Sequence, residues 1–248
     1  MELTLRTLSE EPALRERFSE FHRQAWPRFL HEGNGAGPLW SKIYTDFADF
    51  QFGLRDETGG LVAVGNSIPL ICDGTKADVP PNIPEVLERG VAVKRDDRRP
   101  TALSALAAIV DPSHRGRGLA RRVIETMAEI ARRHGLKTLV APVRPTLKQL
   151  YPLTPMEKYV TWTRAGGAFF DPWLQVHQRM GAEVLLVASK AMVVTDTVAR
   201  WHEWTGLRFP ESGLYVVPGA FQPVKIDVRR DSGRYEEANV WMRHPLGG

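Results

Sequence analysis

The stretch of this chain best suited to chemistry is a basic, glycine-containing turn at residues 110–120, Val-Asp-Pro-Ser-His-Arg-Gly-Arg-Gly-Leu-Ala. It lies between an apolar run of strand length, Ala102 to Val110, and a segment whose apolar residues recur with helical spacing. Glycines let a ligand approach the backbone, and the amides at a helix N-terminus carry partial positive charge. Four arginines lie close together here, at Arg115, Arg117, Arg121 and Arg122. The turn therefore predicts a site for an anion such as a pyrophosphate.

Two common phosphate-binding motifs do not fit this turn. A dinucleotide fingerprint requires Gly-x-Gly-x-x-Gly, and Arg121 occupies the position of the third glycine. A Walker loop requires Gly-Lys-Ser/Thr, and that triplet does not follow here. A connecting turn with solvated arginines remains the alternative that needs no ligand.

The pattern Arg115-x-x-Gly118-x-Ala120, preceded by Val110-x-Pro112, resembles the acetyl-CoA signature of the GNAT acyltransferase superfamily, Gln/Arg-x-x-Gly-x-Gly/Ala. More specifically, the chain resembles a bacterial-type, acetyl-CoA-dependent N-acetyltransferase with an unassigned acceptor. The resemblance implies that the turn cradles the coenzyme pyrophosphate and that the preceding strand offers backbone amides to the thioester carbonyl. The residues implied to bind acetyl-CoA or CoA are Ile109, Val110, Arg115, Gly116, Arg117, Gly118, Leu119, Ala120 and Arg121.

A second, weaker part of the resemblance concerns the helix that follows the fifth strand. The superfamily often ends this helix with Tyr-x-x-x-Gly-Phe, and residues 177–182 of this chain read His-Gln-Arg-Met-Gly-Ala. The tyrosine that often protonates the departing thiolate is thus replaced by His177. An imidazole with an ordinary pKa of roughly 6.5 can act as an acid, so His177 is the candidate general acid. A histidine satisfied within the fold is the alternative.

The resemblance implies direct attack by an acceptor amine on acetyl-CoA in a ternary complex. A base must take the proton of an ammonium acceptor, and the strand Ala102 to Val110 contains no acidic residue. Acids that would border an acceptor site are Glu32, Asp46, Asp73 and Glu88. Cys72 ends an apolar strand without a histidine nearby in sequence, so we expect it to pack rather than to form an acyl-enzyme. Arg144 is a candidate for holding an anionic acceptor or the coenzyme, and a solvated loop arginine is the alternative.

The elements that must position these residues predict an α/β protein. The order β, α, α, β, β, β, α, β, α, β over roughly residues 2–194 resembles the GNAT fold, a mixed, largely antiparallel sheet flanked by helices. Besides the strand at 102–110, the sequence predicts a short helix at 85–89 and strands at 138–143 and about 237–242. Residues 1–194 are the expected acetyltransferase core, with insertions at about 72–100 and 144–172. Residues 195–248 are the expected C-terminal β-rich extension, packed on the same domain.

Composition excludes several classes of protein. The 248 residues are 43% hydrophobic, enough for a packed core, and the single cysteine excludes an internal disulfide or a multi-cysteine zinc site. No metal is implied. No span approaches the roughly 18 apolar residues of a membrane helix, and the acidic start does not resemble a signal peptide. We therefore expect a cytoplasmic protein that does not bind membranes.

Two alternatives to an enzyme remain open. Tryptophans in the second half and the arginines at positions 229, 230 and 234 raise nucleic-acid binding, but acidic residues interleave with these arginines and leave no basic stripe. A CoA-binding module without catalysis is the second alternative. The partners expected from the preferred interpretation are a small-molecule or peptide amine acceptor and no nucleic acid, and a homodimer is left open.

Overall fold

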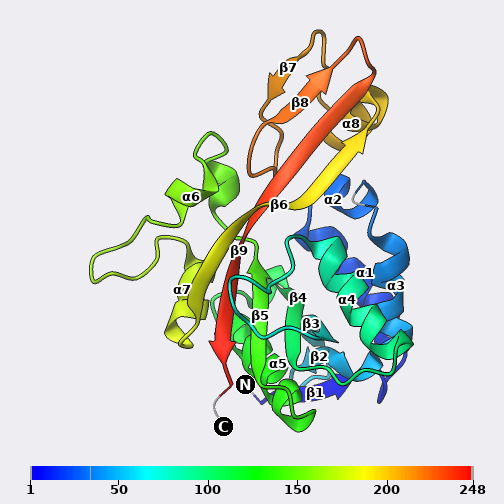
Figure 1. Cartoon of the computed structure of the whole chain (residues 1–248), viewed down its shortest axis with the longest axis vertical. Coiled ribbons are helices and arrows are strands. Elements are labelled where there is room, and N and C mark those ends of the chain that lie inside the picture. Colours follow the sequence, from blue (N-terminus) through cyan, green and yellow to red (C-terminus); the bar gives the residue numbers. More distant parts are fainter. Residues whose placement is uncertain (1, 34, 247–248) are drawn as a thin grey trace.

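A mixed sheet of nine strands forms the centre of the computed structural model, which describes residues 2–33 and 35–246 (Figure 1). The strands are β1 (Thr4–Thr7), β2 (Gln51–Arg55), β3 (Leu61–Leu70), β4 (Ala102–Val110), β5 (Thr138–Val143), β6 (Glu183–Asp196), β7 (Gly213–Tyr215), β8 (Val224–Asp227) and β9 (Ser232–Pro245). Their order is β1-β2-β3-β4-β5-β9-β8-β7, and β6 pairs with β9 outside this path. β4 and β5 run parallel, whereas the other described pairs are antiparallel. The predicted mixed, largely antiparallel sheet is confirmed.

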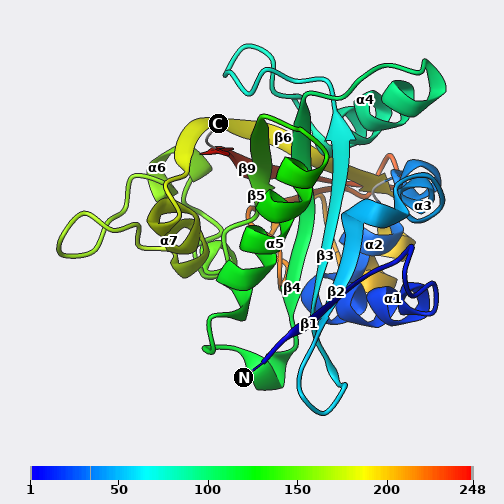
Figure 2. The same ribbon diagram turned by 90° about the horizontal axis from the view of Figure 1, so that it is seen from below.

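Helices cover both faces of this sheet. They are α1 (Leu14–Ala25), α2 (Arg28–Glu32), α3 (Gly37–Asp46), α4 (Ile83–Arg95), α5 (Leu119–Arg133), α6 (Met156–Tyr159), α7 (Pro172–Arg179) and α8 (Val198–Thr205). α1, α3 and α4 lie on one face, and α5 and α7 lie on the other (Figure 2). None of the helices in the described ranges is both long and apolar enough to cross a membrane.

α5 is fixed against the sheet beside β4 by one apolar face. Leu119, Val123, Met127 and Ile130 recur at helical spacing and are buried. The helix stops before Gly135, whose φ of +69° is the left-handed conformation that glycine adopts without strain. The N-terminus of α5 is therefore held in place at the end of the glycine turn.

β4 and β5 separate along their length. They pair over three residues each, Ala102–Ser104 with Thr138–Val140. Just beyond this pairing, β4 carries an extra residue, Leu106, where its register with β3 shifts. A bulge of this kind bends a strand and increases its local twist. β4 thus leaves β5, and its last residue, Val110, leads into the glycine turn.

The C-terminal part of the chain supplies a strand to the middle of the sheet. β9 lies between β5 and β6, and its residue Val240 pairs with Val143 on one side and Val187 on the other. We expected residues 195–248 to be β-rich, with a strand at about 237–242, and left open whether they extend the sheet, form a small appended lobe or mediate a dimer. The observed β9 is longer and completes the sheet, while the domain boundaries themselves stay predictions.

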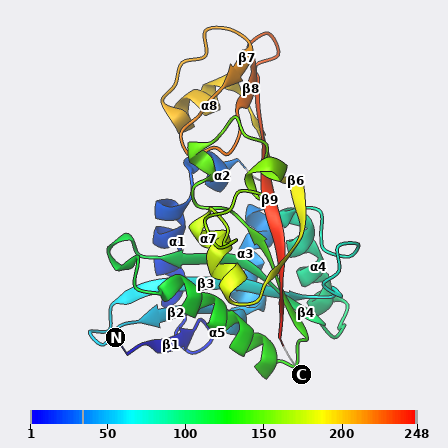
Figure 3. The ribbon, with the colours of Figure 1, turned by 90° about the vertical axis from the view of Figure 1, so that its left-hand side faces the viewer.

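The residues between β6 and β9 form a lobe at one end of the molecule (Figure 3). α8, β7 and β8 enclose a hydrophobic cluster of their own around Trp201 and Trp204. Phe29 and Leu30 of α2 belong to the same cluster. The lobe is therefore packed on α2, the short helix between α1 and α3.

Candidate functional site

The glycine turn has a backbone that only glycine adopts freely. Gly116 and Gly118 have φ values of +78° and +79°, in the left-handed region. A Cβ added at either residue would meet no atom within 4 Å among the described residues, apart from its chain neighbours. The side chain of Asp111 accepts a hydrogen bond from the backbone N–H of Ser113 at 2.9 Å, which fixes the entry to the turn. The turn therefore presents bare backbone to open space.

Six consecutive backbone N–H groups of this turn, those of residues 116–121, donate to no acceptor in the described chain. The first donor of α5 with a partner is Arg122, whose N–H reaches the carbonyl of Gly118 at 3.2 Å. Unpaired amides at a helix N-terminus, together with the helix dipole, make an anion-binding site. The residues present thus fit the pyrophosphate of a coenzyme.

The four arginines near the turn divide into two pairs. Arg121 and Arg122 lie on α5 and form ion pairs with Glu125 and Glu129, each at 2.7 Å. Arg115 and Arg117 are exposed and have no ion pair within the residues described. Because paired charges largely neutralise each other, the free positive charge at the turn comes from Arg115 and Arg117.

Ile109 and Val110 lie where the sequence placed them, at the end of β4 next to the turn. Both belong to the part of β4 that does not pair with β5, and they pair with Val64 and Ala63 of β3. The side chain of Ile109 packs with α1, and that of Val110 packs on the other hydrophobic cluster, with α5. The structure thus brings these two residues and the turn together at the open side of β4.

His177 lies inside the protein. Its side chain is 1% exposed, its Nδ1 is 2.8 Å from Nε2 of His244 in β9, and the Trp173 ring lies 4.4 Å away. Its Nε2 is buried and finds no partner among the residues described. Burial, and then the neighbouring His244 ring, holds the pKa of His177 well below its ordinary value. At neutral pH the ring is therefore uncharged, which favours a role within the fold, and the role as an acid stays a prediction.

Buried neutral histidines predict a loss of stability in mild acid. Burial lowers the pKa of His22 and of His244 to about 4, whereas the unfolded chain titrates near 6.5. The unfolded state therefore binds more protons between these values, so stability is complete above pH 6.5 and falls as the pH drops toward 4. At pH 5, the lowered pKa of each of these histidines decreases the free energy of unfolding by about 2 kcal/mol. Urea unfolding of the wild type and of His244→Asn at pH 7 and pH 5 measures this decrease. Between the two pH values, the variant should lose about 2 kcal/mol less of its free energy of unfolding than the wild type. An equal loss in the two proteins would contradict the prediction.

The acids named from the sequence do not provide an evident base. Hydrogen bonds from Arg28 and Trp204 lower the pKa of Glu32 to about 2. Asp46 ends α3 and lies 3.7 Å from Lys94, and Glu88 is exposed on α4. The fourth residue, Asp73, lies beside Cys72 at the opposite end of β4.

Cys72 is a buried thiol far along the sheet from the turn. Its backbone N–H binds Thr101 Oγ1 at 3.0 Å, just before β4 begins. Burial raises its pKa to about 11, so the thiol is protonated at neutral pH. The ligating atoms of Cys72, Asp73 and Asp78 lie within 4.8 Å of one another. However, both carboxylates accept backbone hydrogen bonds that close this loop, at 2.7 and 2.8 Å, so loop geometry accounts for their proximity.

Arg144 holds parts of the protein together. Its Nε lies 3.0 and 3.1 Å from the two carboxylate oxygens of Glu237, which is 1% exposed. Its Nη2 donates to the carbonyl of Gly219 at 2.8 Å, and its guanidinium lies 3.9 Å from the centre of the Phe221 ring. Arg144 thus ties the end of β5 to β9 and to the lobe. Sequence reasoning missed Glu237 because it is 93 residues away from Arg144.

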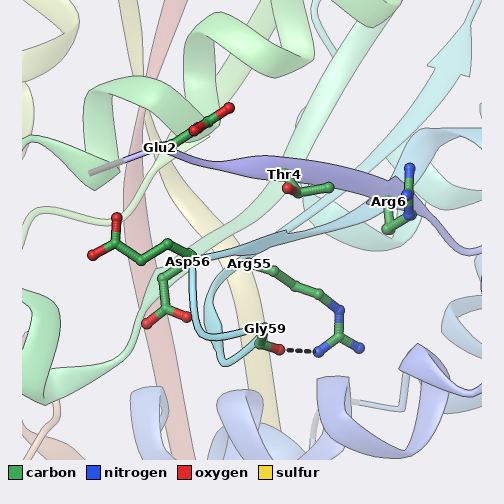
Figure 4. Close-up of a pocket in the computed structure, with 7 residues that line it drawn as sticks. Glu2, Thr4, Arg6, Arg55, Asp56 and Gly59 are labelled. Carbon is green, nitrogen blue, oxygen red and sulfur yellow. Dashed lines mark hydrogen bonds between the residues drawn. The ribbon is translucent and has the colours of Figure 1, made fainter.

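A pocket of about 450 Å³ lies on the outer edge of the sheet (Figure 4). One of its lining residues, Asp56, lies 3.9 Å from His114 of the turn. Its lining is Glu2, Thr4, Arg6, Arg55, Asp56, Glu57 and Gly59. Arg55 donates to the carbonyl of Gly59 at 2.6 Å, and Asp56 accepts from the backbone of Gly60 at 2.9 Å. These bonds shape the β2–β3 hairpin, so we assign the pocket no chemistry.

A buried polar chain on β3 was also missed from the sequence. Gln51 Nε2 donates to the carbonyls of Phe47 and Ser67 at 2.9 and 2.8 Å, which leaves its Oε1 to accept from Asn66 Nδ2 at 3.1 Å. Asn66 Oδ1 then faces His22 Nε2 at 2.8 Å, so this nitrogen donates. In the uncharged ring, the lone pair is therefore on His22 Nδ1. The polar Asn66 and Ser67 within an apolar strand were the available signal.

Comparison with known proteins agrees with this geometry. The profile of the "Acetyltransferase (GNAT) family" matches residues 89–153, which include β4, the turn and α5. The arginine N-acetyltransferase avaD of Aspergillus versicolor is 32% identical over 250 residues, covering 89% of this chain and 85% of the relative. This relative is fungal, so it gives the expected bacterial type no support.

Two solved structures share the fold over almost the whole chain. The loading GNATL domain of CurA from Lyngbya majuscula has a TM-score of 0.62 and 16% identity, covering 99% of this chain and 98% of its own. The GphF GNAT-like decarboxylase in complex with isobutyryl-CoA has a TM-score of 0.61 and 19% identity, with 100% of both chains covered. At these identities the likeness concerns the fold alone. Together with the extended similarity to avaD, the turn and the splayed strands lead to one conclusion: the chain belongs to the GNAT acetyltransferase family.

Proposed function

We propose that this protein transfers an acetyl group from acetyl-CoA to an amine by direct attack in a ternary complex. The observation that carries the proposal is the run of unpaired amides at residues 116–121, beside the end of β4. In the proposed complex, Arg115 to Arg121 hold the pyrophosphate, and the part of β4 with Ile109 and Val110 lies along the thioester. Backbone amides there are suited to stabilise the oxyanion.

The acceptor in this proposal is an amino acid, and arginine is the first to test. The relative avaD is named an arginine N-acetyltransferase and is similar over most of both chains. The amine nitrogen forms a bond to the acetyl carbon and gives up a proton, the carbon–sulfur bond breaks, and the thiolate takes up a proton to leave as CoA. The protonated state and the position of Cys72 support direct transfer over an acyl-enzyme. A cytoplasmic location belongs to the proposal as well.

An assay of released CoA thiol tests the proposed function. With acetyl-CoA and L-arginine, we expect thiol release that requires both substrates, together with acetylated arginine detected by mass spectrometry. Binding of acetyl-CoA without thiol release from any amine in a panel of amino acids would instead identify a CoA-binding module without catalysis. The same assay tests His177 with the variant His177→Gln. If His177 is the general acid, this variant should have a kcat about 100-fold lower and an unchanged affinity for the coenzyme.

A further inference from the structure

Aromatic rings from two helices, α1 and α3, gather on the face of the sheet opposite α5. His22 lies in the last turn of α1, and Trp26 is the residue that directly follows this helix. Their rings stack, with centroids 4.9 Å apart and an interplanar angle of 11°. Trp40 of α3 lies edge-on to both rings, at 5.6 and 5.7 Å. Trp26 and Trp40 are half-buried, so part of each indole remains accessible. We call the group formed by His22, Trp26 and Trp40 the aromatic wall.

The aromatic wall lies beside the bulge of β4. His22 is hydrogen-bonded to Asn66, and Asn66 pairs in the sheet with Ala107, next to the bulged Leu106. Trp26 packs against the hydrophobic cluster that contains Ala107 and Ile109 of β4. The wall therefore borders the part of β4 along which we placed the thioester. It does so from the α1 face, whereas α5 and its turn approach from the other face (Figure 2).

The wall carries no positive charge of its own at neutral pH. Burial lowers the pKa of His22 to about 4, and the tautomer fixed by Asn66 leaves a lone pair on Nδ1. That nitrogen has no hydrogen-bond partner in the described part of the chain. Next to the wall, the Arg15 guanidinium lies over the Tyr44 ring at 5.7 Å, and Tyr44 accepts from Trp40 Nε1 at 3.1 Å.

We propose that the aromatic wall recognises the acceptor, and that the acceptor is an amine whose other end is a planar cation, such as a guanidinium. This proposal rests on the proposed function and names its substrate class. Indole faces attract cations, and a partly desolvated cation on such a face gains about 5- to 30-fold in affinity. His22 Nδ1 accepts a hydrogen bond from the cation, which a protonated imidazole would repel. An acceptor held there reaches the end of β4 from the side opposite the coenzyme turn.

L-arginine and L-citrulline separate charge from shape, because the planar ureido group of citrulline is uncharged. Calorimetric titration of each amino acid into the protein saturated with CoA needs no turnover, so a failure here is distinct from a failure of acetyl transfer. We expect arginine to bind about 5- to 30-fold more tightly than citrulline. Trp40→Leu should remove this preference, and Trp40→Phe, which keeps an aromatic face, should retain it.

The titration includes a control for folding and has three results that would overturn the proposed role of the aromatic wall. A melting temperature that still rises with CoA identifies folded variants, and Trp26→Leu replaces Trp40→Leu if the latter does not fold. Equal binding of arginine and citrulline by the wild type would overturn the proposal, as would absence of arginine binding. A preference for arginine that survives in both leucine variants would also overturn it.

Discussion

Substituting Gly118 by glutamate is expected to abolish coenzyme binding, raising the Kd for acetyl-CoA by at least about 1,000-fold, or ~4 kcal/mol. The new side chain starts in the open space in front of the turn, where, apart from its chain neighbours, no atom of the described residues lies within 4 Å of the Cβ position. The glutamate carboxylate would accept hydrogen bonds from the backbone amides proposed to bind the pyrophosphate, and its negative charge would repel the pyrophosphate. Hydrogen bonds to charged groups contribute about 1.5–3 kcal/mol each, so losing several accounts for the size of the effect. Isothermal titration calorimetry measures it.

The matched control lies at the other end of the same helix. Gly135 has a φ of +69°, and a Cβ added there would meet Arg99 Nη2 at an ordinary contact distance of 3.8 Å. Gly135→Glu therefore imposes a similar backbone strain away from the turn. We expect this variant to bind acetyl-CoA within about twofold of the wild type. Equal losses in both variants would trace the effect to strain in α5, and wild-type affinity in Gly118→Glu would remove the turn from the binding site.

Replacing Glu237 by alanine is expected to lower the free energy of unfolding by about 3–5 kcal/mol, because it leaves the Arg144 charge without its partner in a largely buried site. The carboxylate accepts from Arg144 Nε at 3.0 Å and from the Tyr235 hydroxyl at 2.8 Å. For a chain of this length the loss corresponds to a decrease in Tm of roughly 6–20 °C. Urea unfolding followed by circular dichroism gives the free energy.

The neighbouring Glu236 provides the control for this variant. It pairs with Arg234 at 2.7 Å and with Lys190 at 3.2 Å, but on the surface of β9. Exposed ion pairs contribute about 0–1 kcal/mol, so Glu236→Ala should be nearly neutral. Similar losses in the two variants would show that the buried pair is no more important than a surface one.

The Arg144–Glu237 pair also connects the lobe with the aromatic wall. Arg144 binds the carbonyl of Gly219, and a Cβ added at Gly219 would lie 2.7 Å from the Pro27 ring. Pro27 follows Trp26 directly in the chain. The lobe thus supports the segment that carries the proposed acceptor-binding residues.

Elements with a strong local pattern were predicted from the sequence almost to the residue. β4 and β5 have the expected bounds, because each is a mainly apolar run of strand length between turn residues. α4 was expected only at 85–89, but it spans Ile83–Arg95. Asn82 caps it at 2.8 Å from Glu85 N, and close packing of Gly90 on Ile68 offsets the low helix propensity of its glycine and valines.

The candidate site divides in the same way. The glycine turn could be predicted because its glycines, cations and helix start are contiguous in sequence. The pairing of His22 with Asn66 could not, because it joins residues 44 positions apart and depends on how α1 packs on β3. β9 was underestimated for a related reason: Arg234 and Glu236 alternate on an exposed face, so only its apolar second half had a strand-like pattern.

A crystal structure of the protein with bound CoA tests the central claim most directly. The account predicts pyrophosphate oxygens at about 2.7–3.2 Å from backbone nitrogens of residues 116–121. It also predicts the sulfur end of the coenzyme beside β4, between the bulge at Leu106 and Val110. A pyrophosphate bound elsewhere, with these amides facing solvent, would contradict the account.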